Sequence, residues 1–304
     1  MKCFYHRADH DGLCSAAIVK RAHPEAELVG IDYGEPFPWE QVDPGEEVWL
    51  VDFSLPPADM FRLDAYTRGA DGFYNLVWID HHKTAIEAMK GRIFKGLIAD
   101  GVGACALTWR YCFPDQDMPL AVRLLAAYDV WDHADDQALD LHYGLWVNGP
   151  EDRVWNFLLD DNRLLLDELI ARGHAIRDYE RKENAARAAC LCFDFVLDGL
   201  KCLMANFGPS NSAFFDSRWD PEKYQAMCLF SWRPGVGKWK VSLYTTRADV
   251  DVSAVCKARG GGGHRGAAGF EVDSLLDLGL EPKTAALMAD YKGGFERYYG
   301  ALDK

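Results

Sequence analysis

Short hydrophobic runs alternate with amphipathic segments over the first hundred residues of the chain. Lys2–His6 and Glu27–Asp32 are predicted strands, and Gly12–Ala22 between them is predicted to be a helix. Two longer apolar runs follow, EVWLVDF and FYNLVWID, and each has an aspartate at its carboxyl end, Asp52 and Asp80. Apolar runs separated by helical patterns are typical of βαβ units, in which helices cover both faces of a parallel sheet. We therefore predict an α/β fold for this part of the chain.

The pattern becomes helical over residues 103–183 and then changes again. Four strand-like runs follow (LCFDFVL, KCLMANF, YQAMCLFSW and KWKVSLYTT), then a helical segment at residues 252–258 and the stretch RGGGGHRGAAGFEV. Several strands with one short helix predict a smaller α+β domain. We place the boundary near Ala186, so the predicted domains are residues 1–186 and 187–304.

The composition is typical of a folded protein. A length of 304 residues with 49% hydrophobic residues is enough for two cores. No apolar stretch of about 18 residues occurs and the first residues do not resemble a signal peptide, so we expect no membrane association and a cytoplasmic location. The nine cysteines include no C-x-x-C pair, which favours reduced thiols over disulfides.

The net charge of −14 argues against a protein that binds long nucleic acid, because such binding depends on a basic surface. A short anionic substrate is not excluded. If carboxylates are gathered around divalent cations, part of the negative charge belongs to a metal site.

Side chains that can bind a metal follow three of the predicted strands. Because the carboxyl ends of parallel strands meet at one edge of a sheet, we expect these side chains to converge. Mixed imidazole and carboxylate ligands suit manganese, iron, cobalt or zinc, and a set rich in carboxylates favours manganese or magnesium. The candidates are His6, Asp9, Asp11, Asp52, Asp80, His81 and His82.

Two further segments each have an ordinary interpretation and a functional one. Asp129, in AAYDVWDH, is either an acid at the end of a helix or a further ligand, and Asp132 and His133 compete with it. GGGGHRGAAG is either a flexible loop or a place where backbone N–H groups approach an anion closely. His264 and Arg265 within it would add side-chain donors and favour the second interpretation.

Taken together, HRADHDG, VDFS, DHHKT, YDVW and GGGGHRGAAGF occur in an order that resembles the DHH phosphoesterase superfamily with its C-terminal DHH-associated domain. The resemblance covers nearly the whole chain. The compact opening motif, the SLYTT segment and the two-domain length are most similar to the nano-RNase or oligoribonuclease branch, in particular its NrnB-like members.

The resemblance implies two divalent cations per chain, with Mn²⁺ ahead of Mg²⁺ and Co²⁺. One ion would be held by His6, Asp9 and Asp52, and the second by Asp11, Asp52, His81 and Asp129, with Asp52 bridging them. Asp80 would orient an imidazole, and His82 would contact the reacting phosphate. The substrate-binding residues that the resemblance implies are Arg247, Gly261, Gly262, Gly263, His264 and Arg265.

The activity implied is hydrolysis of short single-stranded oligonucleotides or dinucleotides to mononucleotides from the 3′ end, by a water activated between two metals. Binding of long duplexes and of membranes is not expected, and a homodimer is left open. Alternative substrates are cyclic dinucleotides and 3′-phosphoadenosine phosphate. An alternative of another class is a non-catalytic nucleotide sensor.

Overall fold

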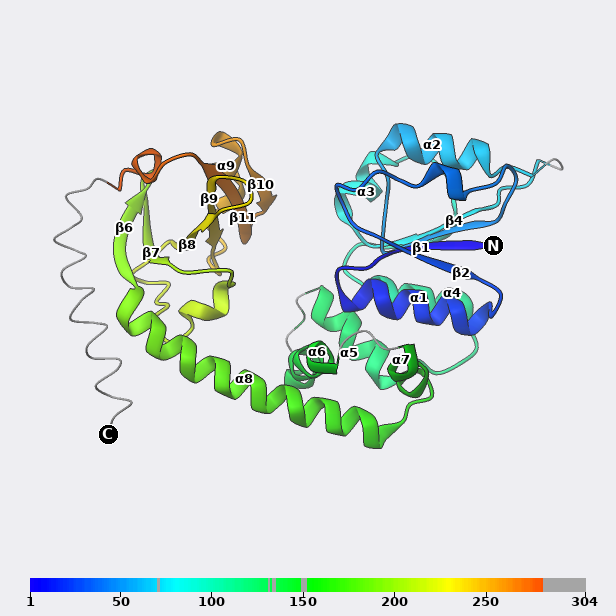
Figure 1. Ribbon diagram of the computed structural model, residues 1–304, viewed down its shortest axis with the longest axis horizontal. Helices are drawn as coiled ribbons and strands as arrows, with labels where there is room; N and C mark the ends of the chain where they lie inside the picture. The colour runs from blue at the N-terminus through cyan, green and yellow to red at the C-terminus, as the bar shows by residue number, and fades with distance from the viewer. Residues whose placement is uncertain (70–71, 131, 133–134, 149–151, 281–304) are drawn as a thin grey trace. The chain divides into compact units, whose positions relative to one another are not determined.

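The computed structural model describes residues 1–304 except 70–71, 131, 133–134, 149–151 and 281–304, and its ribbon is shown in Figure 1. The chain divides into two compact units, residues 1–177 and 178–304. Helix α8 (Arg163–Leu191) contains both this dividing point and residue 186, where the sequence places the boundary. Each unit is described by itself below.

The first unit is built on a five-stranded sheet in which every neighbouring pair of strands is parallel. The order of the strands is β2-β1-β3-β4-β5. This sheet confirms the predicted α/β fold. The strands are β1 (Lys2–His6), β2 (Glu27–Ile31), β3 (Val48–Val51), β4 (Leu76–Asp80) and β5 (Lys95–Ile98).

The strand β5 was not predicted from the sequence. It is only four residues long, and one of them is Gly96, a residue that is unfavourable in strands. Gly96 has φ +133°, and a Cβ atom there would lie 1.9 Å from the carbonyl oxygen of Trp78. Glycine is therefore required at this position by the close approach of β4.

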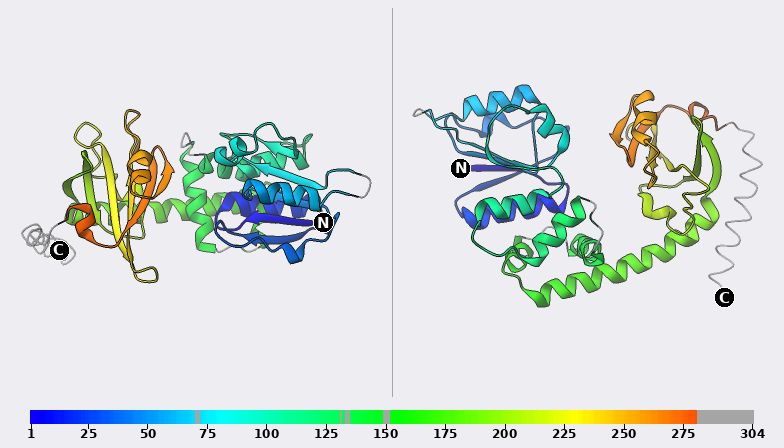
Figure 2. Two further views of the ribbon diagram at one scale, coloured as in Figure 1. Left: turned by 90° about the horizontal axis from the view of Figure 1, so that it is seen from above. Right: turned by 180° about the vertical axis from the view of Figure 1, so that it is seen from behind.

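Helices cover both faces of this sheet, and alternate residues of each strand face one layer or the other. Leu50 and Trp78 belong to the core beneath helices α2 and α3, and Trp49 and Ile79 to the core against α1 and α4. Figures 1 and 2 show these two layers. Each fully buried side chain of this size contributes about 1.5–3 kcal/mol, so these cores fix the sheet edge that carries the polar residues. The helices are α1 (His10–Ala22), α2 (Pro57–Tyr66), α3 (Lys83–Ala88) and α4 (Ala104–Cys112), with a 3₁₀ turn, η1, at Trp39–Gln41.

The rest of the first unit is helical, as predicted. A further core joins α1 and α4 to the following helices, with Leu125, Leu141 and Leu169 fully buried in it. This packing sets the position of Asp129, the last residue of α5. The helices are α5 (Leu120–Asp129), α6 (Asp136–Asn148), α7 (Asp152–Leu159) and the first part of α8.

The second unit contains a six-stranded mixed sheet with the order β10-β11-β9-β8-β7-β6. The pair β7–β8 is parallel and the other pairs are antiparallel, which confirms the predicted mixed fold of this part. One face of the sheet packs against helix α9 (Val252–Ala258), and the other against the 3₁₀ turn η2 (Ser212–Phe215). Figure 2 shows these strands from above. The strands are β6 (Phe193–Leu197), β7 (Leu200–Asn206), β8 (Ala226–Arg233), β9 (Lys238–Tyr244), β10 (Gly262–His264) and β11 (Ala267–Val272), followed by the turn η3 (Leu275–Leu278).

Two further features concern the cysteines and the apolar character of the helices. The nine cysteines are free thiols. Among the described residues, no helix combines the length and the apolar character that crossing a membrane requires.

Candidate functional site

The order of strands in the first unit reverses between β1 and β3. In doubly wound sheets ligands bind outside the carboxyl ends of the strands at such a point. His6 is the last residue of β1, and Asp52 directly follows β3. The fold therefore places these two side chains at the expected ligand position.

Helix α1 begins directly over the end of β1. Asp9 is the N-cap of this helix and accepts a hydrogen bond of 2.9 Å from the backbone N–H of Gly12. A Cβ atom at Gly12 would lie 1.8 Å from the carbonyl oxygen of His6, so only glycine permits this close contact. The short spacing of the opening motif thus brings Asp9 beside His6.

His6, Asp9 and Asp52 form one group whose potential ligand atoms lie within 4.8 Å of one another. The Nδ1 atom of His6 is 2.8 Å from Asp9 Oδ2 and 3.7 Å from Asp52 Oδ2. These are the three residues that the family resemblance implies as ligands of the first ion.

Asp11, His81 and Asp129 form a second group within the same limit. The Nε2 atom of His81 lies 3.0 Å from Asp129 Oδ2, 3.4 Å from Asp52 Oδ1 and 3.7 Å from Asp11 Oδ2. Asp52 therefore directs Oδ1 toward His81 and Oδ2 toward His6. The structure brings together all six residues that the family resemblance implies as metal ligands.

The carboxylate of Asp52 has the features of a metal-binding group. The residue is 1% exposed, and both oxygens are buried without a hydrogen-bond partner among the described residues. Its backbone has φ +52°, a left-handed conformation that, apart from glycine, mainly asparagine and aspartate adopt. A buried carboxylate left without donors is costly unless a cation compensates it. Its surroundings therefore fit a pair of divalent cations, one on each side.

The pKa values of His6, His81 and Asp11 show how strongly the neighbouring carboxylates attract positive charge. Burial alone would lower the pKa of His6, but the carboxylates of Asp52 and Asp9 raise it to about 10. In the same way burial opposes protonation of His81, whereas Asp129, Asp52 and Asp11 raise its pKa to about 11. Burial, together with the charge of Asp52 and Asp129, raises the pKa of Asp11 well above its usual range. Bound cations would take the place of these protons.

Like that of Asp9, the side chains of Asp11 and Asp80 accept hydrogen bonds from backbone N–H groups. Asp11 accepts hydrogen bonds from Ala104 and Cys105 at the start of α4, at 2.6 and 2.8 Å. Asp80 is fully buried and accepts from the backbone N–H groups of His81 and His82. These bonds hold both carboxylates in fixed orientations.

Asp80 belongs to none of the three groups of potential ligands found among the described residues, whereas His82 forms the third group with Asp52 and His81. The Nδ1 atom of His82 is 2.7 Å from Asp80 Oδ1. Asp80 therefore orients the His82 ring, which leaves its other nitrogen directed away from Asp80.

Asp32 was not proposed as a site residue from the sequence. Its Oδ1 atom lies 3.6 Å from Nε2 of His6 and is buried without a hydrogen-bond partner among the described residues. This is the ring nitrogen of His6 that faces away from Asp9 and Asp52. A carboxylate behind a ligating histidine is a common arrangement, because it fixes the tautomer and the orientation of the ring. The sequence contains a signal for it, since Asp32 directly follows β2 as Asp52 follows β3.

His10 lies in the middle of the opening motif but turns toward the helical core. Its Nδ1 atom is 3.3 Å from Nδ1 of His142, and the Nε2 atom of His142 accepts a hydrogen bond from Trp146. Burial lowers the pKa of His10 to about 4, so its ring is neutral. His10 therefore connects α1 to α6 and is not among the groups of potential metal ligands that the described residues form.

The glycine-rich segment of the second unit is not a loop throughout, because β10 pairs with β11 as an edge strand. Gly260 and Gly263 have φ values of +78° and +137°. A Cβ atom at Gly261 would lie 2.1 Å from the carbonyl oxygen of Gly269. Backbone geometry and packing thus account for these three glycines, while a Cβ atom at Gly262 would have no neighbour within 4 Å among the described atoms.

Gly261 and Gly262 line an open hollow of about 610 Å³ on the second unit. The guanidinium groups of Arg247 and Arg265 are engaged elsewhere. Arg247 donates to both carboxylate oxygens of Asp249, and Arg265 donates to backbone carbonyl groups. Neither arginine lines this hollow. The side chain of His264 lies outside the described part of the structure.

No family model matches the sequence. A curated relative, the uncharacterised protein R106 of Acanthamoeba polyphaga mimivirus, is 26% identical over 218 residues, which cover 65% of this chain and 48% of that protein. The chain thus spans about half the length of this relative.

Two solved structures are similar to the whole chain. A pGpG-specific phosphodiesterase, PggH, from Vibrio cholerae has a TM-score of 0.50 and 14% identity, with 96% of this chain and 99% of that chain covered. The DHH domain of a member of a family of ribosomal proteins has the same TM-score and identity, with 96% and 85% covered. The chain has the fold of a DHH-domain protein.

Replacement of Asp52 by asparagine should stabilise the metal-free protein and abolish its response to metal. Asparagine tolerates positive φ and removes a buried charge, and burial is the main cause of the raised pKa of Asp52. We expect the free energy of unfolding to rise by about 1–3 kcal/mol without metal. Mn²⁺ should raise the melting temperature of the wild type but not of Asp52→Asn. Asp115→Asn, which changes an exposed aspartate, should behave as wild type. A variant that Mn²⁺ stabilises as strongly as the wild type would contradict the role given to Asp52.

Replacement of Asp32 by asparagine should weaken metal binding about 10- to 100-fold, the usual effect of losing a carboxylate behind a ligating histidine. Isothermal titration calorimetry with Mn²⁺ measures this change directly. Asp100→Asn is the matched control, because Asp100 is an exposed aspartate just beyond β5, the opposite edge strand. If Asp32→Asn and Asp100→Asn lower the affinity for Mn²⁺ by the same factor, Asp32 acts only through its charge and does not orient His6.

Proposed function

We propose that the chain is a metal-dependent phosphodiesterase of the DHH superfamily, of the oligoribonuclease type, which hydrolyses short oligonucleotides to mononucleotides. The observation that carries this proposal is the position of Asp52 at the switch point, where one oxygen is directed toward His6 and the other toward His81. Neither oxygen has a hydrogen-bond partner among the described residues. That arrangement favours two metals joined by one carboxylate.

The ligands proposed for the two ions are His6, Asp9 and Asp52 on one side and Asp11, Asp52, His81 and Asp129 on the other. The four aspartates carry four negative charges, which two divalent cations would neutralise. The donor set of carboxylates and imidazoles, without thiolates, favours Mn²⁺ over a zinc site. When bound, a pair of such ions supplies an activated water and neutralises the charge that develops on the phosphoryl oxygens.

His82 is the side chain proposed to act on the phosphate itself. Burial alone would lower its pKa, but the hydrogen bond with Asp80 raises it. With Nδ1 held by Asp80, the Nε2 atom faces away from Asp80 and would donate to a phosphoryl oxygen when the ring is protonated. Asp80 thus fixes the direction of the donor, and its own bonds to backbone N–H groups fix Asp80.

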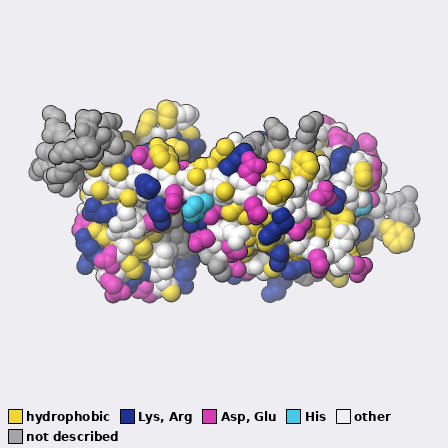
Figure 3. All heavy atoms as spheres, turned by 90° about the horizontal axis from the view of Figure 1, so that it is seen from below, with side chains coloured by type: hydrophobic (Ala, Val, Ile, Leu, Met, Phe, Trp, Pro, Cys, Tyr) yellow, Lys and Arg dark blue, Asp and Glu magenta, His cyan; other side chains and the backbone are white. Residues whose placement is uncertain are grey.

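The distribution of charge on the surface and one structure neighbour support a short substrate. Figure 3 shows one face of the molecule, on which acidic and basic side chains of the described residues are interspersed. With a net charge of −14, such a surface disfavours a long polyanion. The DHH-fold neighbour from Vibrio cholerae is specific for pGpG, which supports a substrate of dinucleotide size.

The proposal is tested with metal-stripped protein, with and without Mn²⁺, on a panel of RNA and DNA dinucleotides, longer single strands, cyclic dinucleotides and 3′-phosphoadenosine phosphate. We expect Mn²⁺-dependent release of mononucleotides, fastest from the shortest linear substrates. Chromatography of the products identifies both the substrate and the bond that is cut.

The other outcomes of this panel are equally informative. Hydrolysis of only the cyclic dinucleotides or 3′-phosphoadenosine phosphate would assign one of those substrates in place of oligonucleotides. Binding of two metals per chain without any hydrolysis would favour a nucleotide sensor and overturn the proposed activity.

The two adjacent histidines provide a sharper test of the mechanism. His82→Ala should lower kcat about 10²- to 10³-fold, as expected for a lost donor to the transition state, and leave Mn²⁺ affinity near that of the wild type. His81→Ala should instead weaken Mn²⁺ binding, because the lost imidazole faces Asp129, Asp52 and Asp11. Calorimetry and steady-state kinetics on both variants separate the two roles. Equal loss of metal affinity in both would show that His82 is a ligand as well.

A further inference from the structure

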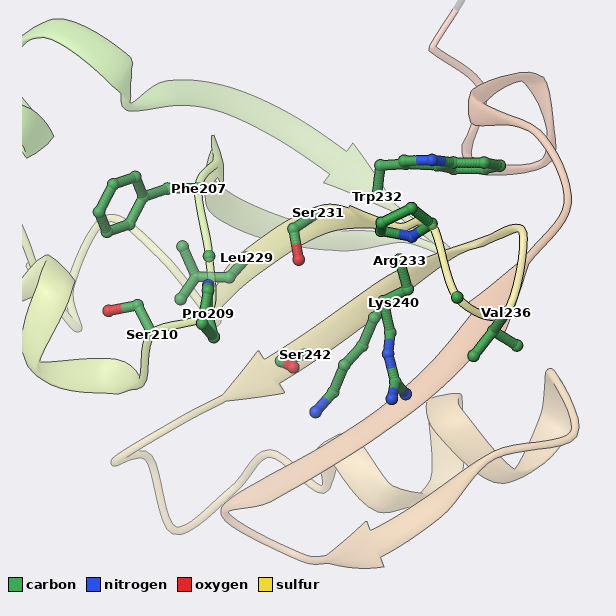
Figure 4. A pocket seen from close by; sticks show the side chains of 13 residues that line it. Phe207, Pro209, Ser210, Leu229, Ser231, Trp232, Arg233, Val236, Lys240 and Ser242 are labelled. Carbon is green, nitrogen blue, oxygen red and sulfur yellow. The ribbon is translucent and has the colours of Figure 1, made fainter.

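The second unit carries another open hollow, of about 420 Å³, beside the one lined by the glycines. It lies over strands β8 and β9, next to the end of β7. Figure 4 shows the side chains of Ser231, Ser242, Lys240 and Arg233 around it. Of the described residues, Lys240 alone belongs to the linings of both hollows.

The strand register places the polar groups on one face of the sheet. Ser231 on β8 lies directly opposite Lys240 on β9, and residues opposite each other in an antiparallel pair project from the same face. Ser242 is two residues beyond Lys240 on the same strand, so its side chain also points to that face. Two hydroxyl groups and one ammonium group therefore share this part of the surface.

Lys240 differs from the other cations that line the two hollows. Arg233 is paired with Glu271 at 3.1 Å, Lys238 with Asp273 at 3.4 Å, and Arg259 with Asp198. Among the described residues, Lys240 has no acidic partner. Glu271 lies opposite Lys240 on β11, yet its carboxylate accepts from Arg233.

An exposed ammonium group with two hydroxyl groups on the same face of the sheet has donors that a phosphate group requires. Lysine binds phosphate as a point charge, and hydroxyl groups add directed hydrogen bonds. Gly262 and Lys240 line the same hollow, and no described atom lies within 4 Å of where a Cβ atom of Gly262 would be.

We propose that Lys240, together with Ser231 and Ser242, binds a phosphate group of a nucleotide on the second unit. This inference rests on the proposed function for the choice of a nucleotide, and it places the phosphate site on the second unit by itself. It names a cation that the sequence motifs do not indicate, in addition to Arg247 and Arg265, whose guanidinium groups contact other groups.

The test measures binding of AMP, adenosine and inorganic phosphate to the full chain by calorimetry, with EDTA present to keep metals away. We expect AMP to bind more tightly than adenosine. Lys240→Gln should weaken AMP binding about 10-fold, the effect of one lost charge-assisted hydrogen bond, and leave adenosine binding unchanged. Ser231→Ala should have a smaller effect in the same direction.

Lys201→Gln is the matched control, since Lys201 is an exposed lysine on β7 of the same sheet that lines neither hollow. It should bind AMP as the wild type does. The inference is overturned if Lys240→Gln retains wild-type affinity for AMP, or if the wild type does not distinguish AMP from adenosine. Weak binding of inorganic phosphate that Lys240→Gln abolishes would support it. Because these measurements use no metal and no turnover, their outcome is independent of whether the chain hydrolyses oligonucleotides.

Discussion

The mutual repulsion of four carboxylates at one end of the parallel sheet is the constraint on which the first unit depends. The backbone holds them in place: Asp9 caps α1, Asp11 accepts from the start of α4, and Asp52 follows β3 in a left-handed conformation. None of these backbone features brings a positive charge to the carboxylates. The raised pKa values of His6 and His81 show that the group retains protons where it lacks another source of positive charge. A group of this kind could hold cations, and their binding would be coupled to its stability.

The four carboxylates are surrounded by imidazole groups, and further carboxylates lie beside those imidazoles. His6 and His81 face the aspartates of the centre, while Asp32 and Asp80 lie beside imidazoles without belonging to any group of potential ligands among the described residues. Asp80 is within hydrogen-bond distance of Nδ1 of His82 and so sets which nitrogen of that ring faces away from it, whereas Asp32 lies 3.6 Å from Nε2 of His6. This gives a positioning role to the two acids at strand ends that belong to none of these groups.

The glycine-rich segment illustrates how packing and function share one motif. Gly261 and Gly263 are required by the close approach of β11, and Gly260 by its positive φ, so they need no ligand to explain them. Gly262 has neither constraint and faces open space. The cation proposed to bind a phosphate there is Lys240 on β9, which lines the same hollow. A conspicuous motif thus marks a region of the surface, while the groups proposed to bind there come from a neighbouring strand.

The sequence by itself determined the α/β class, the strand ends and the six candidate ligands, because hydrophobic periodicity and the DHH motifs are local properties of the chain. It missed β5, whose glycine is required by contact with β4, and it did not indicate Asp32 as a partner of His6. Only the tertiary structure decided that Asp52 faces two histidines, that Asp80 orients His82, and that Lys240 lacks an acidic partner within the described part of the chain. These facts depend on distances between side chains far apart in sequence, which strand order and register set and which no local pattern records.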